Sequence, residues 1–294
     1  MPKPRNILKR TRAIGNIRTV TKAMQAVASA QFKLAYDRIV SFGPFATELV
    51  ATVADVIARS PAKVLDHPLL EAPEGVGHEV LLLLTSNRGL CGSYNTGVLN
   101  VGIHRLGQLR NAGYEVDLHL VGRRGVQYIE FRGHKIDRVY EQFDGVPRYE
   151  AAASLADSMM SDFLARRISG LEVAYTQFVS SGQQRPAVAP ILPLSDLPTR
   201  GKDAEAEQEV PFPYDFLPSP QEILRKLLPL TVRMKLYQCF LDSAAAEHLT
   251  RRAAMQAATD NADDMIHELT LLANRQRQRH ITTELAEIMS GRGG

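Results

Sequence analysis

The sequence predicts a Rossmann-like α/β central domain, a parallel sheet with an antiparallel edge, plus a long antiparallel coiled coil formed by the N- and C-terminal helices. Three observations predict this fold: both ends of the chain have a helical apolar period, strands alternate with helices between them, and each end helix carries an apolar stripe that needs a partner. The expected boundaries are residues 1–59 for the first coiled-coil helix, 76–195 for the α/β domain, 196–218 for a linker and 219–290 for the second coiled-coil helix.

The first 59 residues have apolar side chains at spacings of three, four and seven, which is typical of one face of a helix. The expected stripe consists of Ile7, Ile14, Ile17, Val20, Met24, Val27 and Leu34. Gly43-Pro44 should kink or break the helix. Nine Lys or Arg against one acid lie between Met1 and Arg38, which indicates either an acidic partner or a solvated face.

The middle of the chain alternates between strand and helix patterns. Strands are expected at 79–85, 115–121, 171–180 and 186–194, and the last two form a hairpin around "SGQQRP". Helices are expected at 95–111, 124–132 and 149–167, and glycines follow each of them. This order favours a parallel sheet that ends in an antiparallel pair.

The C-terminal helix begins with Ser219 as N-cap, Pro220 at the first position and Glu222 at the third, and Pro229 should interrupt it. Its expected seam is Met255, Ala258, Ala262, Met265, Leu269 and Leu272. The run Asn274–His280 has no apolar residue, so this level either leaves its partner and faces another protein or is merely exposed. Long helices need their stripes buried, and the simplest partner for each end helix is the other.

The stretch "TSNRGLCGSYN", Thr85–Asn95, lies between a predicted strand and a predicted helix, where many folds present N–H groups to a phosphate. It matches neither GxGxxG nor the P-loop, and no lysine follows it. We interpret Gly89 and Gly92 as a tight turn that packs the helix closely on the strand. Arg88 is expected in a surface ion pair, and Cys91, like Cys239, is expected to be a small buried residue.

No Ser-His-Asp order, paired carboxylates or clustered metal ligands emerge, so we expect no catalytic site and no cofactor. No apolar run approaches the roughly 20 residues of a membrane span, and no signal peptide is evident, so cytoplasm is the default location. Two alternatives stay open from residues alone: a basic coiled-coil protein that binds nucleic acid, and a small nucleotide enzyme centred on the glycine turn. The absence of Trp weighs against the first, and no nucleic acid is expected.

Three stretches together resemble the γ subunit of the F-type ATP synthase, its central stalk. "ILKRTRAIGNIRTVTKAMQAVASAQF" resembles the N-terminal helix of that family, and "TSNRGLCGSYN" resembles its S-D-R-G-L-C-G-x-x-N turn. "AAMQAATDNADDMIHELTLLANRQRQRHITTELAEIMSG" resembles its C-terminal helix. The resemblance covers essentially the whole chain, in order.

The resemblance implies a non-catalytic rotor whose coiled coil stands in an α3β3 hexamer of α and β subunits, with the α/β domain against the ε subunit and the c-ring. Ion flow would turn the shaft and drive the nucleotide sites of the β subunits. The location implied is the cytoplasmic face of the bacterial plasma (inner) membrane, as a peripheral part of the complex. The coupling ion, H⁺ or Na⁺, stays open.

The same resemblance assigns residues to the contact and coupling between rotor and stator. They are Arg18, Lys22, Met24, Arg251, Arg277, Gln278, Thr282 and Glu284. The turn of the central domain is represented by Asn87, Arg88, Gly89, Cys91 and Gly92. Asn87 stands where the family usually has Asp, so any ion pair made by that acid is absent. The cysteine-bearing insertion of the chloroplast type is missing, which argues against thiol control.

Overall fold

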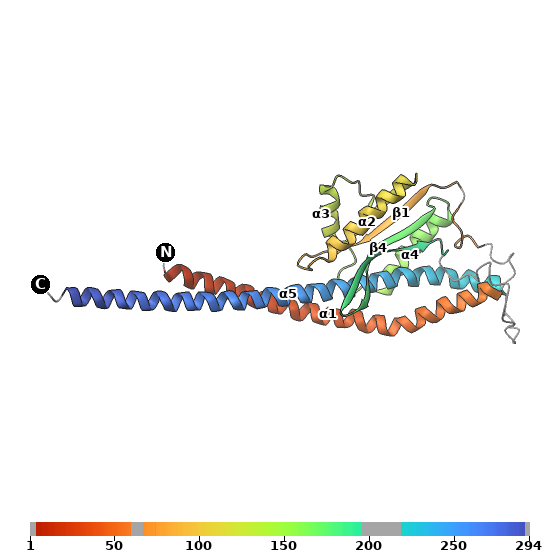
Figure 1. Ribbon diagram of the computed structural model, residues 1–294. Coiled ribbons are helices and arrows are strands. Elements are labelled where there is room, and N and C mark those ends of the chain that lie inside the picture. The colour runs from red at the N-terminus through yellow and green to blue at the C-terminus, as the bar shows by residue number, and fades with distance from the viewer. Residues whose placement is uncertain (1–3, 60–66, 74, 196–218, 292–294) are drawn as a thin grey trace, which may run out of the picture. The chain divides into compact units, whose positions relative to one another are not determined.

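The computed structural model describes residues 4–59, 67–73, 75–195 and 219–291 (Figure 1). The predicted linker, 196–218, lies outside the described residues. The chain forms two compact units: residues 1–30 with 251–294, here the terminal unit, and residues 31–250, here the central unit. The four-part division expected from the sequence remains a prediction.

Five helices and five strands are described. They are α1 (Pro4–Arg59), β1 (His78–Leu84), α2 (Tyr94–Asn111), β2 (Glu115–Val121), α3 (Arg123–Phe131), β3 (Arg138–Tyr140), α4 (Tyr149–Leu164), β4 (Gly170–Ser180), β5 (Gln183–Leu192) and α5 (Pro220–Ser290). The strand order is β3-β2-β1-β4-β5, with β4 and β5 antiparallel and every other pair parallel. The predicted mixed sheet with an antiparallel edge is confirmed.

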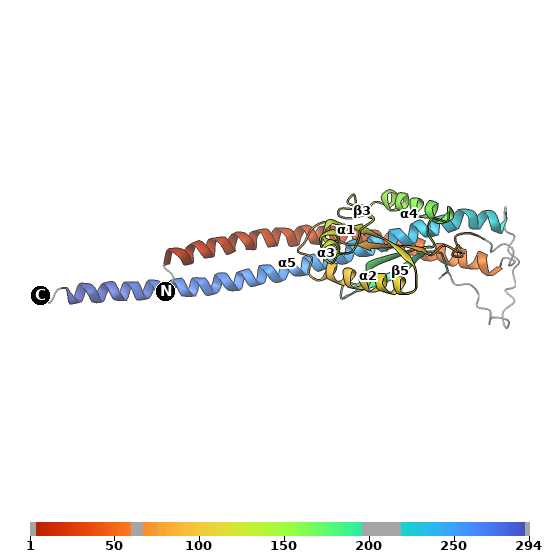
Figure 2. The ribbon, with the colours of Figure 1, turned by 90° about the horizontal axis from the view of Figure 1, so that it is seen from above.

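The central unit has helices on both faces of its sheet. Side chains of α2 and α3 pack with Leu81, Leu83 and Leu118 on one face. Side chains of α1, α4 and α5 pack with Val80, Leu82 and other residues on the opposite face. Figure 2 shows α2 and α4 on opposite sides of the strands. The alternation of strand residues between two buried faces explains why β1 reads as a continuous apolar run.

The expected interruption at Pro229 is wrong, and at Pro44, where a kink or a break was expected, the break is excluded. Pro44 lies inside α1 and Pro229 lies inside α5, and neither ends its helix. Figure 1 shows that the course of α1 curves within the central unit. Buried neighbours explain the continuity: Leu49 and Val53 follow Pro44, and Leu228 and Val232 flank Pro229. Their packing outweighs the roughly 3 kcal/mol that a proline costs inside a helix.

Strand β3, which is only three residues long, was not predicted. The predicted hairpin turn contains too many residues. Serine 181 and Gly182 alone separate β4 from β5. The Ser219 cap is confirmed, because the N–H of Glu222 donates to Ser219 Oγ at 3.3 Å.

Helix α1 is long and apolar enough, by length and composition alone, to cross a membrane, with a mean hydropathy of 1.4 over an 18-residue window. The expectation that no such stretch exists is therefore wrong at this level. In the central unit, however, the apolar residues Leu49, Val53, Val56 and Ile57 of α1 pack into the core against the sheet and α5. Only 17% of the apolar window is buried, so these four side chains form a buried stripe on a helix that is otherwise exposed or half-buried over this stretch.

Gly102 sets the distance between α2 and the sheet. A Cβ added at this position would lie 2.8 Å from Leu83 Cδ2 and 2.9 Å from Leu83 Cγ. Leu83 is fully buried and has no room to move aside. The close approach that the sequence analysis assigned to Gly92 is therefore made by Gly102.

Gly102→Ala should destabilise the chain by about 1–3 kcal/mol, because the new methyl group overlaps Leu83 in a filled core. Gly107→Ala, on the same helix with open space around its Cα, should instead stabilise by about 0.5–1 kcal/mol through helix propensity. Urea unfolding of both variants measures the difference. Equal effects of the two substitutions would contradict this packing.

Candidate functional site

The terminal unit contains two antiparallel helical segments, one from α1 and one from α5. Three side-chain contacts fix their direction: Arg18 pairs with Asp263, Thr21 with Thr259, and Gln25 with Gln256. Residue numbers on α5 fall as those on α1 rise. The predicted antiparallel pairing is confirmed for this unit.

The seam between the two segments follows a strict alternation of four- and three-residue steps. The seam positions on α1, each buried or half-buried, are Ile7, Thr11, Ile14, Arg18, Thr21, Gln25 and Ala28. The seam positions on α5, also buried or half-buried, are Met255, Thr259, Ala262, Ile266, Leu269, Ala273 and Gln276. This spacing is the a/d pattern of a coiled coil.

Some residues of the two predicted apolar stripes lie in the seam, and others are exposed. Ile7 and Ile14 on α1, and Met255, Ala262 and Leu269 on α5, belong to the seam as expected. The exposed members of the predicted stripes are Ile17, Val20, Val27 and Leu34 on α1, and Met265 and Leu272 on α5. Val27 is 60% exposed, whereas its neighbour Ala28 is 1% exposed. The seam uses small side chains where the sequence analysis chose large ones.

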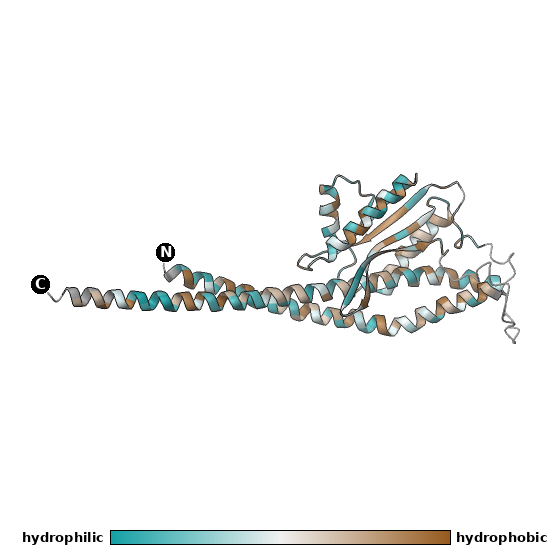
Figure 3. Ribbon diagram, viewed as in Figure 1, coloured by the Kyte–Doolittle hydropathy of each residue, from teal (hydrophilic) through white to brown (hydrophobic). Residues whose placement is uncertain are grey.

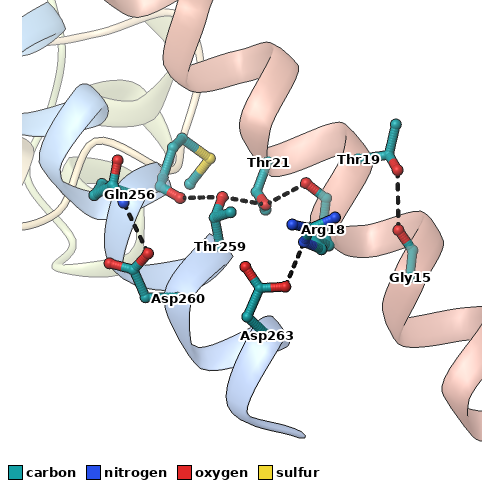
Figure 4. A network of polar contacts seen from close by, with 9 residues as sticks. Gly15, Arg18, Thr19, Thr21, Gln256, Thr259, Asp260 and Asp263 are labelled. Atoms are coloured by element: carbon teal, nitrogen blue, oxygen red, sulfur yellow. Dashed lines mark hydrogen bonds and ion pairs between the residues drawn. The ribbon is translucent and has the colours of Figure 1, made fainter. Parts of the chain in front are cut away.

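A polar layer interrupts the seam (Figure 4). The hydroxyls of Thr21 and Thr259 lie 2.8 Å apart, and each also lies within hydrogen-bond distance of a carbonyl oxygen on its own helix, that of Arg18 or Met255. The two hydroxyl groups have only two protons for these three contacts. One threonine therefore donates across the seam while the other donates to its own helix. Around this pair lie the Arg18–Asp263 ion pair and the Gln25–Gln256 contact.

The exposed apolar side chains form a second face. Ile17, Val20, Met24 and Val27 each lie one residue before a seam position of α1, and Ala258, Met265 and Leu272 do so on α5. One residue is a rotation of about 100° around a helix. Because the segments are antiparallel, these rotations carry both sets to the same side of the pair. We call this the exposed apolar face; Met24 and Ala258 are half-buried there and the other five side chains are exposed.

Helix α5 continues past the described start of α1, as Figure 2 shows. The register places Gln276 opposite Pro4, so residues 277–290 lie beyond it. Figure 3 shows a hydrophilic band here between more hydrophobic stretches of α5, which matches Asn274–His280. Beyond this band Ile281, Leu285 and Met289 are exposed. By this register Asn274–Gln276 still lie opposite the first described turn of α1 and residues 277–280 lie beyond it, so the departure of the whole polar level from its partner stays a prediction.

The residues predicted for rotor–stator contact occupy different surroundings. Lys22 is exposed, Met24 is half-buried on the exposed apolar face, and Arg18 is engaged with Asp263. Arg251 is buried, unlike the surface residue its predicted role would suggest.

The remaining four of these residues lie on the extension of α5. Arg277, Gln278 and Thr282 are exposed there, and Thr282 Oγ1 donates to the Gln278 carbonyl at 2.8 Å. Glu284 belongs to the same helix, but its side chain lies outside the described residues.

The glycine turn of the central unit is occupied by its own side chains. The Ser86 N–H donates to Asn95 Oδ1 at 2.9 Å, and Asn95 Nδ2 lies 2.8 Å from Ser86 Oγ and 3.2 Å from Cys91 Sγ. The Tyr94 N–H donates to the Cys91 carbonyl. These amides are therefore engaged within the protein, which disfavours a phosphate cradle.

The other turn residues tie it to neighbouring elements. Asn87 Nδ2 donates to the Phe143 carbonyl at 3.0 Å, and Asn87 Oδ1 accepts from the N–H of Arg123 at the start of α3. An aspartate at this position could accept but, when ionised, could not donate. Asn87 thus makes one bond that an aspartate at this position would lose.

Arg88 and Asp144 form the predicted surface ion pair at 2.8 Å. A Cβ on Gly89 would lie 3.2 Å from the Arg124 side chain. Gly92 has φ +56°, and a Cβ there would lie 2.8 Å from Thr250 Cγ2 on α5. Gly92 therefore packs the turn against α5, and the expected strand–helix contact is wrong for it. Cys91 and Cys239 are both buried, as predicted.

Comparisons with known proteins give full-length matches. The family described as ATP synthase matches residues 3–293. An ATP synthase gamma chain of Rhodopirellula baltica is 35% identical over 294 residues, covering 99% of this chain and 98% of that protein. One from Streptomyces avermitilis is 36% identical over 287 residues, covering 96% and 93%.

Solved structures show the same fold at low identity. A chain of the Euglena gracilis mitochondrial ATP synthase, in a structure of OSCP, F1 and c-ring, has TM-score 0.65 and 15% identity, with 98% of this chain and 93% of that chain covered. A chain in the Tetrahymena thermophila mitochondrial ATP synthase central stalk and c-ring has TM-score 0.55 and 20% identity, with 81% and 99% covered.

The threonine pair can be tested by a double-mutant cycle. Thr21→Val and Thr259→Val should each destabilise the chain by about 0.5–1 kcal/mol, because each leaves one hydroxyl facing a methyl group in the seam. The double variant should regain most of this loss, since two matched apolar groups then meet. Thermal unfolding followed by circular dichroism measures the cycle; simple additivity would show that the hydroxyls do not interact.

Proposed function

Because the chain belongs to the family of ATP synthase gamma chains, we propose that it is the non-catalytic rotor of an F-type ATP synthase. It belongs to the F1 part of a membrane-associated complex. Its terminal unit turns within the α3β3 hexamer of α and β subunits, and its central unit contacts the ε subunit and the c-ring. Rotation couples transmembrane ion flow to ATP synthesis or hydrolysis at the β subunits. The complex lies on the cytoplasmic face of the bacterial inner membrane.

The observation that carries this proposal is the exposed apolar face of the terminal unit, next to basic side chains. A smooth apolar surface lets a shaft pass its surroundings without forming lasting ion pairs, since apolar contacts have no fixed direction. Met24 lies on this face and carries no charge. Lys22 is exposed close by and would meet acidic loops of the surrounding subunits.

We propose that Arg18, Lys22, Met24, Arg251, Arg277, Gln278, Thr282 and Glu284 contribute to coupling, in two ways. Lys22, Met24, Arg277, Gln278 and Thr282 contact the stator directly, which their exposed or half-exposed positions allow. Arg18 acts by holding α1 against α5 through Asp263, and Arg251 acts from a buried position. For Glu284 only the family position supports the assignment.

The first test is reconstitution. Co-expression of this chain with its α and β subunits should yield a hexamer whose ATPase activity depends on the chain. Purification of the chain with nucleic acid instead, in a complex that weakens steeply with salt, would favour the alternative of a basic coiled-coil nucleic-acid-binding protein. The full-length gamma-chain relatives favour the rotor.

The second test concerns Met24. Met24→Lys should lower ion pumping per ATP hydrolysed at least about threefold, because a charge on the passing face forms ion pairs that must break during rotation. Folding should change little, since this side chain is half-exposed. Pumping and ATPase rates of the reconstituted complex measure the ratio. Met24→Leu, which keeps an apolar side chain of similar size, is the matched control and should couple normally; normal coupling in Met24→Lys would refute the role.

A further inference from the structure

One buried acid in the central unit has no place in the rotor mechanism. Asp242 lies on α5 and is 4% exposed. Its Oδ1 accepts from Gln238 Nε2 at 3.0 Å, and its carboxyl group also accepts from the backbone N–H of Phe178 in β4. Asp242 thus joins α5 to the hairpin of β4 and β5.

The position of Phe178 explains why a carboxyl group is needed there. Strand β1 pairs with β4 only from Glu79 to Leu83, opposite Gly170 to Ala174. Beyond Ala174 the inner edge of β4 has no β1 partner for its backbone groups. Asp242 supplies an acceptor to one of these N–H groups, that of Phe178.

The surroundings of Asp242 are apolar or neutral. Around Phe178, α1 contributes Phe32, Ala35 and Ile39, and α5 contributes Ala244 and Ala245. Tyr175 on β4 and Cys239 on α5 are titratable groups that interact with Asp242, and burial raises the pKa of both, so both are neutral at physiological pH. On α1 the titratable Tyr36 contacts the ring of Phe178. Arg185 on β5 influences Tyr175, and Lys235 on α5 influences Cys239. Neither cation is among the groups that act on Asp242 in the described residues.

A cavity provides access from solvent. It has a volume of about 480 Å³ and lies between α1, the hairpin and α5, with Tyr175, Gln238 and Cys239 in its wall. Gln238 therefore contacts the cavity on one side and the carboxyl group of Asp242 on the other.

We propose that Asp242 is a pH-responsive clasp between α5 and the β4–β5 hairpin, closed when its carboxyl group is protonated and loosened when it is ionised. Burial raises the pKa of Asp242 to about 7, and the bonds from Gln238 and Phe178 oppose this only in part. The closed clasp binds the proton more tightly than the opened one, so protonation stabilises the closed form. The stability of the clasp is therefore greatest at low pH and falls as pH rises toward and through 7.

Hydrogen exchange of the full chain tests the clasp. With the opened state titrating near its ordinary pKa of about 4, the opening equilibrium should rise about tenfold between pH 6 and pH 8. Exchange followed by mass spectrometry, corrected for the intrinsic pH dependence, should show this rise in peptides of β4, β5 and α5 around Asp242. Asp242→Asn should abolish it, because the amide keeps an acceptor oxygen and cannot ionise.

The matched control is Asp264→Asn, an exposed acid on the same helix, which should behave like the wild type. An opening equilibrium that is unchanged between the two pH values, or one that still rises tenfold in Asp242→Asn, would overturn the proposal. Carbon-13 NMR of the wild-type carboxyl groups covers the case in which the variant fails to fold. A buried aspartate that titrates between pH 6 and 8 supports the clasp, and titration of every aspartate below about pH 5 refutes it.

Discussion

The pairing of α1 with α5 depends on small side chains at their contact. In the terminal unit Ala28 and Ala262 are almost fully buried, and threonines meet at the polar layer. In the central unit Ala35 packs with Ala244 and Ala245. Small residues let two helix backbones approach closely, and the dispersion contacts of this approach replace those that large apolar side chains would make. In the paired stretches such burial supplies most of the stability of these helices of 56 and 71 residues.

This constraint explains where the sequence predicted the structure and where it did not. Periodicity predicted both long helices, the mixed sheet and the antiparallel pairing, because strand and helix periods are properties of each segment alone. The seam itself was displaced by one residue at Val20, Val27 and Leu34. Hydrophobicity ranks valine and leucine above alanine and threonine, but the close approach of two backbones selects for size. Where large apolar residues recur every seven positions directly beside small residues with the same spacing, the small residues therefore take the seam and the large side chains point outward.

The wrong expectation at Pro229 has a related cause. The cost of a proline inside a helix is local and can be read from the sequence, whereas the burial of Leu228 and Val232 on either side of Pro229 is a property of the fold. The three-residue β3 gives no period to detect. Asn87 illustrates the same limit at the site: the sequence shows an amide where an acid is usual, but only the positions of Phe143 and Arg123 show that the amide both donates and accepts.

The surfaces left exposed explain why this chain needs an assembly. Ile17, Val20 and Val27 on α1, and Ile281, Leu285 and Met289 on α5, face solvent in the isolated chain. Full burial of each such side chain would contribute about 1.5–3 kcal/mol of favourable free energy, which is absent while the side chain is exposed. Residues 277–290 also lie beyond the described start of α1, and a helix of this length is marginal in water without a partner. Both features are consistent with the proposed rotor role, in which other subunits surround the terminal unit, because an apolar surface, unlike one made of ion pairs, does not bind such a partner in one fixed orientation.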